Sequence, residues 1–176
     1  MKRNLIIGVA MVVSCTILLG GQAPAADADP FDGTWRLNVA KSTYRSAPPP
    51  AAGAIDVRRL WTMDDGWKVF MLSGVNQQGE PTIQISTYKV DGRQYPVYNA
   101  ATMAAHLASG TPTTVTRSYR RIDPLTMEFT TYTDGVAGLP GRRTVSKDGK
   151  TYTQTIRSRN AAGELVDNVS VFDRVR

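Results

Sequence analysis

Turn signals recur along most of the chain and separate short segments of strand-forming residues. Gly takes the positive φ that tight turns need, and Asp or Asn bonds its own backbone. The turns are Asp64-Asp65-Gly66, Gln77-Gln78-Gly79, Asp91-Gly92, Asp123-Pro124, Asp134-Gly135, Lys147-Asp148-Gly149 and Asn160-Ala161-Ala162-Gly163. Their spacing of about ten to fifteen residues is typical of an all-β sandwich or barrel.

The segments between the turns are rich in Val, Ile, Thr, Tyr and Phe, which fit the pleated surface of a sheet. The expected strands cover residues 55–63, 67–76, 82–90, 113–122, 125–133, 141–146, 151–159 and 164–174. Because hairpin follows hairpin, we predict an antiparallel up-and-down β-barrel of about eight strands. Closing the sheet removes its edges, and a barrel of this size encloses side chains or one small ligand.

Two segments interrupt this rhythm. Residues 47–53 contain three consecutive prolines, which lack the N–H that a strand donates, so we expect an extended surface loop there. Residues 99–109 are rich in alanine, which favours a helix, and Gly110 can end it. We therefore predict a short helical insert that covers the barrel mouth, plugs it or packs on the outside.

The first 26 residues resemble a secretory signal peptide, which is cleaved from the mature chain. Lys2 and Arg3 precede an apolar run at residues 5–19, and small residues follow at 23–28. The run is shorter than the roughly 20 apolar residues that span a bilayer, so we expect no transmembrane span. Residues 27–176 are then one domain, and we expect a periplasmic or secreted protein.

A lipid anchor at Cys15 is the less favoured alternative, because the apolar run continues past this cysteine through residues 16–19. Cys15 is the chain's one cysteine, so the mature domain has no disulfide and no thiolate.

The chain has 21 Lys+Arg and 15 Asp+Glu; without Lys2 and Arg3 the balance is 19 against 15, an excess of +4. These basic residues are scattered, so we expect no nucleic-acid partner.

The opening Gly33-Thr34-Trp35 resembles the lipocalin signature, in which the tryptophan closes the barrel base and an arginine near the last strand stacks across it. The resemblance implies that Arg174 or Arg176 takes that part. The longer run Gly33-Thr34-Trp35-Arg36-Leu37-Asn38-Val39-Ala40-Lys41-Ser42 is similar to the opening of secreted bacterial lipocalin-like proteins of unknown function. Three later stretches, residues 90–97, 145–151 and 160–164, are also similar to sequences of that family. This resemblance implies a fold and a location, but no chemistry.

The sequence offers few catalytic motifs. His106 is the single histidine, so a metal site lacks ligands, and no metalloprotease, EF-hand, P-loop or nucleophile-elbow motif occurs. We therefore expect no metal and no cofactor. His106 titrates near neutral pH, and we place it at the barrel mouth on the predicted helix.

Arg117 and Tyr119 share one face of their strand. If that face points inward, a buried arginine needs an anionic partner such as a ligand carboxylate; if it points outward, Arg120 and Ile122 point in instead. The predicted ligand-binding residues are Tyr88, Tyr98, His106, Arg117 and Tyr119.

Three functions remain open at this stage. The favoured one is a barrel that binds a small apolar or amphipathic molecule. The second is a cofactor-free lyase, isomerase or decarboxylase that recruits Tyr119, Arg117 and Glu128. The third is a structural or interaction protein of the cell envelope with a filled barrel.

Overall fold

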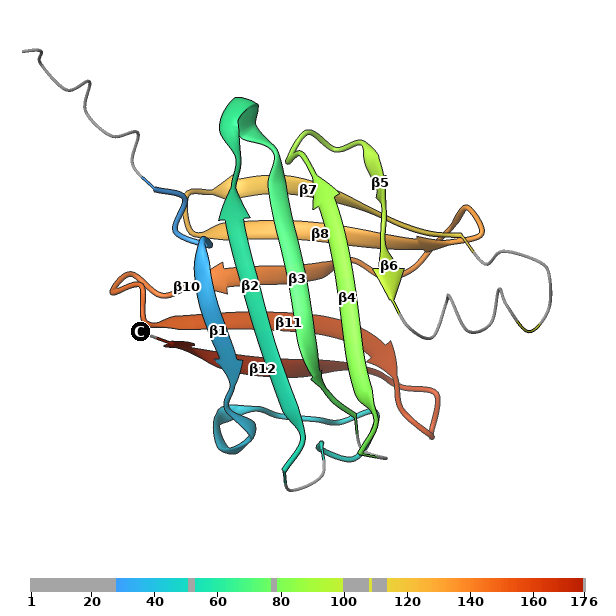
Figure 1. Cartoon of the computed structure of the whole chain (residues 1–176). Coiled ribbons are helices and arrows are strands. Elements are labelled where there is room, and N and C mark those ends of the chain that lie inside the picture. Colours follow the sequence, from blue (N-terminus) through green and yellow to red (C-terminus); the bar gives the residue numbers. More distant parts are fainter. Residues whose placement is uncertain (1–27, 51–52, 77–78, 100–107, 109–113, 176) are drawn as a thin grey trace, which may run out of the picture.

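Twelve strands form one antiparallel sheet that curls into a nearly closed barrel (Figure 1). The structure is a computed structural model that describes residues 28–50, 53–76, 79–99, 108 and 114–175. The strands are β1 (Gly33–Leu37), β2 (Ile55–Thr62), β3 (Lys68–Val75), β4 (Pro81–Tyr88), β5 (Gln94–Pro96), β6 (Tyr98–Asn99), β7 (Val115–Asp123), β8 (Thr126–Thr133), β9 (Val136–Ala137), β10 (Gly141–Val145), β11 (Thr151–Arg159) and β12 (Leu165–Val175). Short 3-10 helices lie at η1 (Val39–Lys41) and η2 (Asp64–Gly66).

Neighbouring strands in the sheet are mostly neighbours in the sequence, so the up-and-down connectivity is confirmed. The order is β5-β7-β8-β10-β11-β12-β1-β2-β3-β4-β6, with β9 paired to β8. The first and last long strands meet, because β1 pairs with β12 on one side and with β2 on the other. The opposite seam is bridged by two short strands, β5 on β7 and β6 on β4.

The all-β prediction is confirmed, but the predicted count of about eight strands is wrong. Every expected segment forms a strand, and β1 precedes them. The additional strands are short: Pro96 ends β5 after three residues, β6 has two residues, and β9 is a two-residue strand that folds back onto β8. The predicted helical insert at residues 99–109 lies outside the described residues, apart from Asn99, which ends β6, and Ala108.

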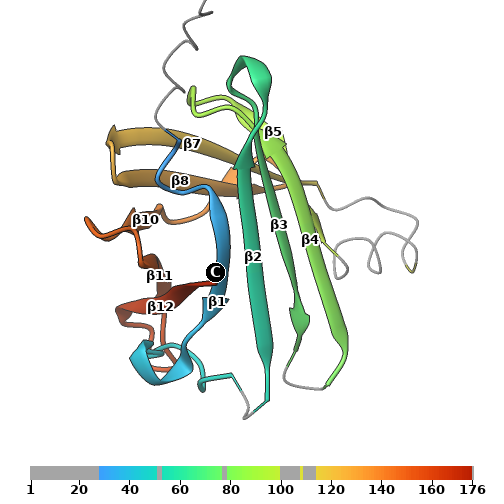
Figure 2. The ribbon, with the colours of Figure 1, turned by 60° about the vertical axis from the view of Figure 1, so that its left-hand side comes forward.

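The barrel is flattened into two layers that cross steeply. Strands β1 to β4 form one layer, and β7, β8, β10, β11 and β12 lie behind it (Figures 1 and 2). Alternate side chains of both layers point into the space between them, as the period of a strand requires. The buried apolar core there consists of Phe31, Trp35, Leu60, Phe70, Tyr88, Tyr119, Met127, Phe129, Val145, Tyr152 and Phe172.

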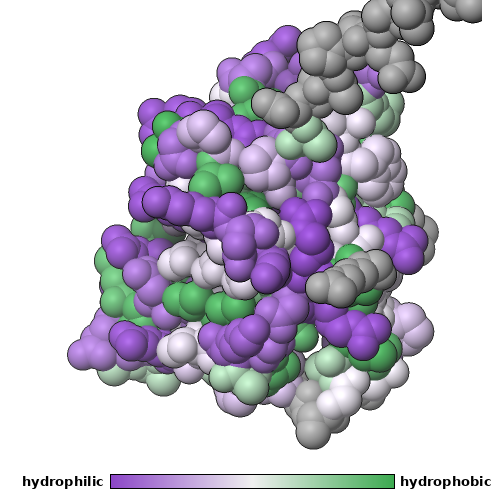
Figure 3. Space-filling view, turned by 90° about the vertical axis from the view of Figure 1, so that its left-hand side faces the viewer, coloured by the Kyte–Doolittle hydropathy of each residue, from purple (hydrophilic) through white to green (hydrophobic). Residues whose placement is uncertain are grey.

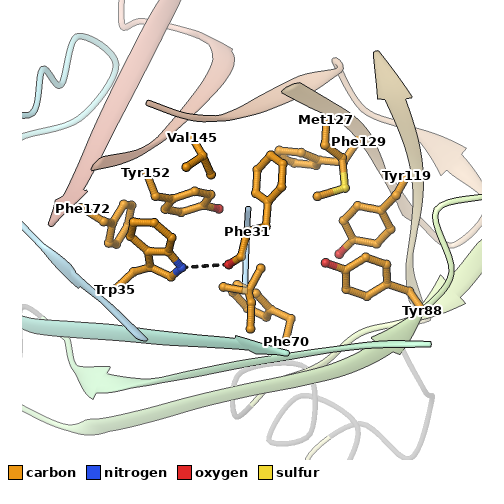
Figure 4. Close-up of a cluster of buried hydrophobic side chains, with 11 residues drawn as sticks. Phe31, Trp35, Phe70, Tyr88, Tyr119, Met127, Phe129, Val145, Tyr152 and Phe172 are labelled. Atoms are coloured by element: carbon orange, nitrogen blue, oxygen red, sulfur yellow. Dashed lines mark hydrogen bonds between the residues drawn. The ribbon is translucent and has the colours of Figure 1, made fainter. Parts of the chain in front are cut away.

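Trp35 closes one end of this interior. Its side chain is fully buried, and its indole N–H donates to the carbonyl oxygen of Phe31 at 2.9 Å (Figure 4). The Arg174 guanidinium lies 4.0 Å from the Trp35 ring centroid and donates to the backbone carbonyls of Pro30 and Asp32. Arg174 therefore has the place that the resemblance implied; Arg176 lies outside the described residues.

Gly33 makes this stacking possible. A Cβ at this position would lie 2.3 Å from Nη1 of Arg174, and the backbone has a φ of +142°, which side chains rarely adopt. The Gly-x-Trp spacing thus places a residue without a side chain where the arginine crosses to the tryptophan.

A charged cluster surrounds the same end of the barrel. The Asp29 carboxylate pairs with Lys68 Nζ at 2.6 Å and with the guanidinium of Arg121. Burial raises the pKa of Asp29, but the hydrogen bonds from Lys68 and Phe31 N–H and the charge of Arg121 hold it below its usual value.

Where the β7–β8 and β10–β11 turns lie, the surface is mostly hydrophilic, with small hydrophobic patches (Figure 3).

We expect Trp35→Ala to lower the free energy of unfolding by about 3–5 kcal/mol, because it deletes a large buried aromatic side chain. Chemical denaturation followed by circular dichroism measures this loss. The matched control is Trp61→Ala, since Trp61 is 42% exposed. Equal midpoints for the two variants would contradict the structural role of Trp35.

We expect Asp29→Asn to destabilise the protein at neutral pH and to lose that effect in acid. The folded pKa of Asp29 lies below its usual value of 3.8, so its stabilisation is present above the unfolded pKa and lost as the pH falls through the folded pKa. Urea denaturation at pH 7, 4 and 2.5 measures the difference from the parent protein. It should shrink in acid, whereas Asp64→Asn at the exposed β2–β3 turn should show little difference at any pH.

Candidate functional site

A polar cluster lies inside the barrel around the side chain of Gln154. Gln154 on β11 pairs with Arg143 on β10, so both side chains point inward at the same level. The Gln154 Oε1 atom accepts from Arg143 Nε at 3.2 Å, from Arg58 Nη1 at 3.0 Å and from the Tyr152 hydroxyl at 3.4 Å. An amide oxygen has two lone pairs, so three donors saturate this acceptor.

Arg58 has a complete set of partners. Its Nε and Nη2 atoms donate to the two oxygens of Asp56 at 3.1 Å and 2.9 Å, and its guanidinium lies 4.0 Å from the centroid of the Phe172 ring. This bidentate pair neutralises the charge of Arg58.

Arg143 lacks such a partner. It is 1% exposed, and it forms no ion pair with any carboxylate of the described residues. Its Cζ lies 4.9 Å from the centroids of Phe70 and Phe129 and 5.4 Å from that of Tyr119, and its Nη1 atom has no hydrogen-bond partner. Ring faces attract a cation but do not replace the hydrogen bonds of water, so this buried charge is costly.

Arg117 lies close to the same place. Tyr119 is 1% exposed whereas Ile122 is 46% exposed. The face of β7 that carries Arg117 and Tyr119 therefore points into the barrel, and the face that carries Ile122 points outward. The Arg117 Cζ lies 5.0 Å from the Phe129 centroid, and its Nε donates to Thr131 Oγ1 at 2.9 Å. Burial, together with the nearby charge of Arg143, lowers the pKa of Arg117. It remains charged at neutral pH, because a guanidinium does not deprotonate in proteins.

Two tyrosines complete the cluster. The rings of Tyr88 and Tyr119 stack with centroids 3.8 Å apart, and both hydroxyls point toward the middle of the interior (Figure 4). The Tyr119 hydroxyl lies beside the guanidiniums of Arg117 and Arg143, near enough for hydrogen bonding to affect the pKa of both arginines, but none of these contacts has the geometry of a full hydrogen bond. Burial, and next the neighbouring Tyr119, raise the pKa of Tyr88, which keeps its phenol neutral. Ser86 Oγ is a further buried atom without a partner.

The Phe129 ring, which both guanidiniums approach, is held in place by Gly141. These two residues pair across β8 and β10. A Cβ on Gly141 would lie 2.3 Å from Cζ of Phe129, so the ring occupies the space that a side chain at position 141 would fill.

A cavity of about 310 Å³ opens at the end of the barrel away from Trp35; we refer to it as the mouth cavity. It lies between the β1–β4 layer, the middle of β12 and the chain that follows η1. Its lining residues are Leu37, Tyr44, Pro50, Ala54, Ile55, Asp56, Leu72, Val75, Asn76, Thr82 and Ser170. Pro50 belongs to the proline segment, so the predicted surface loop forms part of a cavity wall. Asp56 connects the cavity to the polar cluster through Arg58 and Gln154.

Other hollows lie outside the interior, and their charges are already paired. One on the outer face of β10 and β11 is bordered by Arg157, which pairs with Asp167 at 2.9 Å. Another surrounds Asp29 at the closed end. The polar atoms without partners are found in the interior, which makes it the candidate site.

The predicted ligand residues fall into three groups. Tyr88, Arg117 and Tyr119 come together inside the barrel. Tyr98 is 60% exposed on β6 and does not join them, and His106 lies outside the described residues. Glu128, which the enzyme hypothesis named as a residue that could be recruited, pairs with Arg120 at 2.9 Å on the opposite face of the sheet from Tyr119.

Three members of the cluster escaped the sequence analysis: Arg58, Arg143 and Gln154. The sequence contains one signal for Arg143, which stands at alternate positions with Gly141 and Val145. In the structure all three of these β10 residues are buried. An arginine in register with buried apolar neighbours indicates an inward charge.

The described residues contain no group of three His, Cys, Asp or Glu side chains arranged to hold a metal ion. Within the same part of the chain, no helix has the length and apolar character needed to cross a membrane.

Comparison with known proteins adds little to this site. No family model and no curated protein matches the chain. Among solved structures, the crystal structure of Rv2717c from M. tuberculosis is similar to 84% of this chain and 94% of that chain, with 13% identity and a TM-score of 0.49.

We expect Arg143→Met to raise the free energy of unfolding of the ligand-free protein, by about 1–4 kcal/mol, because it replaces an unpaired buried charge by an apolar side chain of similar length. Urea denaturation measures the change. Arg142→Met is the matched control, since the Arg142 side chain is 59% exposed. A lower midpoint for Arg143→Met than for Arg142→Met would show that Arg143 already has sufficient partners.

Proposed function

We propose that this protein binds a small, mostly apolar molecule inside its barrel, which enters through the mouth cavity. The observation that carries this proposal is the cavity itself. Its volume of about 310 Å³ lies at the lower end of the roughly 300–1,000 Å³ that ligand pockets occupy. Leu37, Leu72, Val75 and Ile55 give it apolar walls, as expected for a site whose occupant is held mainly by burial of apolar surface.

Polar residues form the smaller part of the cavity lining. Among them, Asp56 is held by Arg58, and Ser170 belongs to β12. A few fixed polar groups in an apolar wall orient a ligand rather than supply most of its affinity. The ligand is therefore amphipathic, with its apolar part against the walls of the mouth cavity.

A periplasmic or secreted location fits such a carrier, and it is part of the proposal. The charged start, apolar run and small residues of positions 1–26 support it, as does the similarity of the Gly33–Ser42 motif to secreted lipocalin-like proteins. A filled barrel of purely structural role is disfavoured by the mouth cavity, and the separation of Glu128 from Tyr119 gives the enzyme hypothesis no support.

We expect Thr82→Phe to weaken binding of the neutral fluorescent probe N-phenyl-1-naphthylamine at least tenfold. Thr82 lines the mouth cavity, so a phenyl ring there occupies space that the probe needs. Ile83→Phe is the matched control, because the adjacent Ile83 is 47% exposed on the other face of β4 and the same ring there leaves the cavity unchanged. Fluorescence titration of the parent protein and both variants provides the measurement, with circular dichroism as the folding control.

If the parent protein does not bind the probe, the proposed function fails. If both variants bind it as tightly as the parent, binding takes place elsewhere and the mouth cavity is not the site.

A further inference from the structure

We propose that the middle of the barrel binds the carboxylate of an amphipathic ligand between Arg143, Tyr119 and Arg117. This inference rests on the proposed function and deepens it, since it assigns the class of ligand: a carboxylic acid on an apolar chain. The chain lies toward the mouth cavity and the carboxylate lies at the polar cluster.

The described interior contains more positive than negative charge. Three guanidiniums point inward from three strands: Arg58 on β2, Arg117 on β7 and Arg143 on β10. Among the described residues they meet one interior carboxylate, that of Asp56, and Arg58 occupies both of its oxygens. The Asp29 carboxylate at the closed end is already shared by Lys68 and Arg121. Arg117 and Arg143 therefore lack a counter-charge.

Both guanidiniums lie close to one aromatic ring. Their Cζ atoms lie 5.0 Å and 4.9 Å from the centroid of the same Phe129 ring. Burial, and after it the charge of Arg143, lowers the pKa of Arg117, which is the sign of a repulsion between these two like charges. An anion that contacts both would remove it, and its charge would be worth more here than at the surface.

The cluster also contains two donors that are not fully used. Within the described residues, Arg143 Nη1 and the Tyr119 hydroxyl are buried and make no hydrogen bond of good geometry. Two such donors match the two oxygens of a carboxylate. A phosphate has three terminal oxygens and a larger charge to satisfy, and the aromatic surroundings of Phe70 and Phe129 supply no donors for them. The cluster therefore suits a carboxylate better than a phosphate.

The test compares decanoate with decanol, which has the same chain and no charge, and with decyl phosphate. Isothermal titration calorimetry is carried out on the full mature chain and on Arg143→Met, with Arg142→Met as the matched control. We expect the parent protein to bind decanoate at least tenfold more tightly than decanol and than decyl phosphate. Arg143→Met should lose this tenfold preference, and Arg142→Met should keep it.

Tyr119→Phe provides a second variant that removes one hydroxyl and no apolar contact. We expect it to weaken decanoate binding several-fold with an unchanged denaturation midpoint, so the inference remains testable if Arg143→Met does not fold.

Equal affinity of the parent for decanoate and decanol would overturn the inference and leave the proposed function intact. Tighter binding of decyl phosphate would overturn the assignment of a carboxylate. Retention of the preference in both Arg143→Met and Tyr119→Phe would place the anion elsewhere and also overturn the inference. Failure of the parent to bind N-phenyl-1-naphthylamine, decanoate and decanol would overturn both proposals.

Discussion

The pairing of β1 with two strands at once is the constraint on which the barrel depends. This five-residue strand is hydrogen-bonded to β12 on one side and to β2 on the other, so it alone joins the end of the meander to its start. A strand this short has few ladder hydrogen bonds, and its position is fixed instead by Trp35 inside and Arg174 across it. The two steeply crossing layers, and therefore the space between them, follow from this join.

The interior enclosed in this way differs from an ordinary hydrophobic core. Its closed end is apolar and aromatic, around Trp35 and Phe172, but its middle contains guanidiniums and an amide. Aromatic rings face each of these cations, which lowers the cost of burying them without removing it. An interior of this composition is less stable than a purely apolar core would be, because buried charges without a counter-charge raise the free energy of the folded state.

The sequence predicts the fold well and the site only in part. Turn residues and strand composition are local properties, so the hairpins and the all-β class follow from them. The short strands β5, β6 and β9 do not, because each forms only where tertiary pairing holds it.

The arginines of the site show why the rest could not be predicted. Arg58 and Arg59 are adjacent, and so are Arg142 and Arg143; in each pair one side chain is buried and the other is exposed. Neither arginine of a pair differs from its neighbour in residue type, so the choice depends on the residues around it. Arg143 lies in register with Gln154 and Met127, and Arg58 lies in register with Trp35 and Leu72. For Arg117 the same ambiguity of phase is resolved by the pairing of Tyr119 with Phe129.

The contact between Gly141 and Phe129 has a consequence for the variation that this barrel tolerates. The ring approached by both guanidiniums keeps its position only while residue 141 has no side chain. A side chain at this position would move the ring, and with it the surroundings of the two guanidiniums. In a set of related chains, the loss of this glycine would therefore mark a rearranged interior more reliably than the loss of any single surface residue.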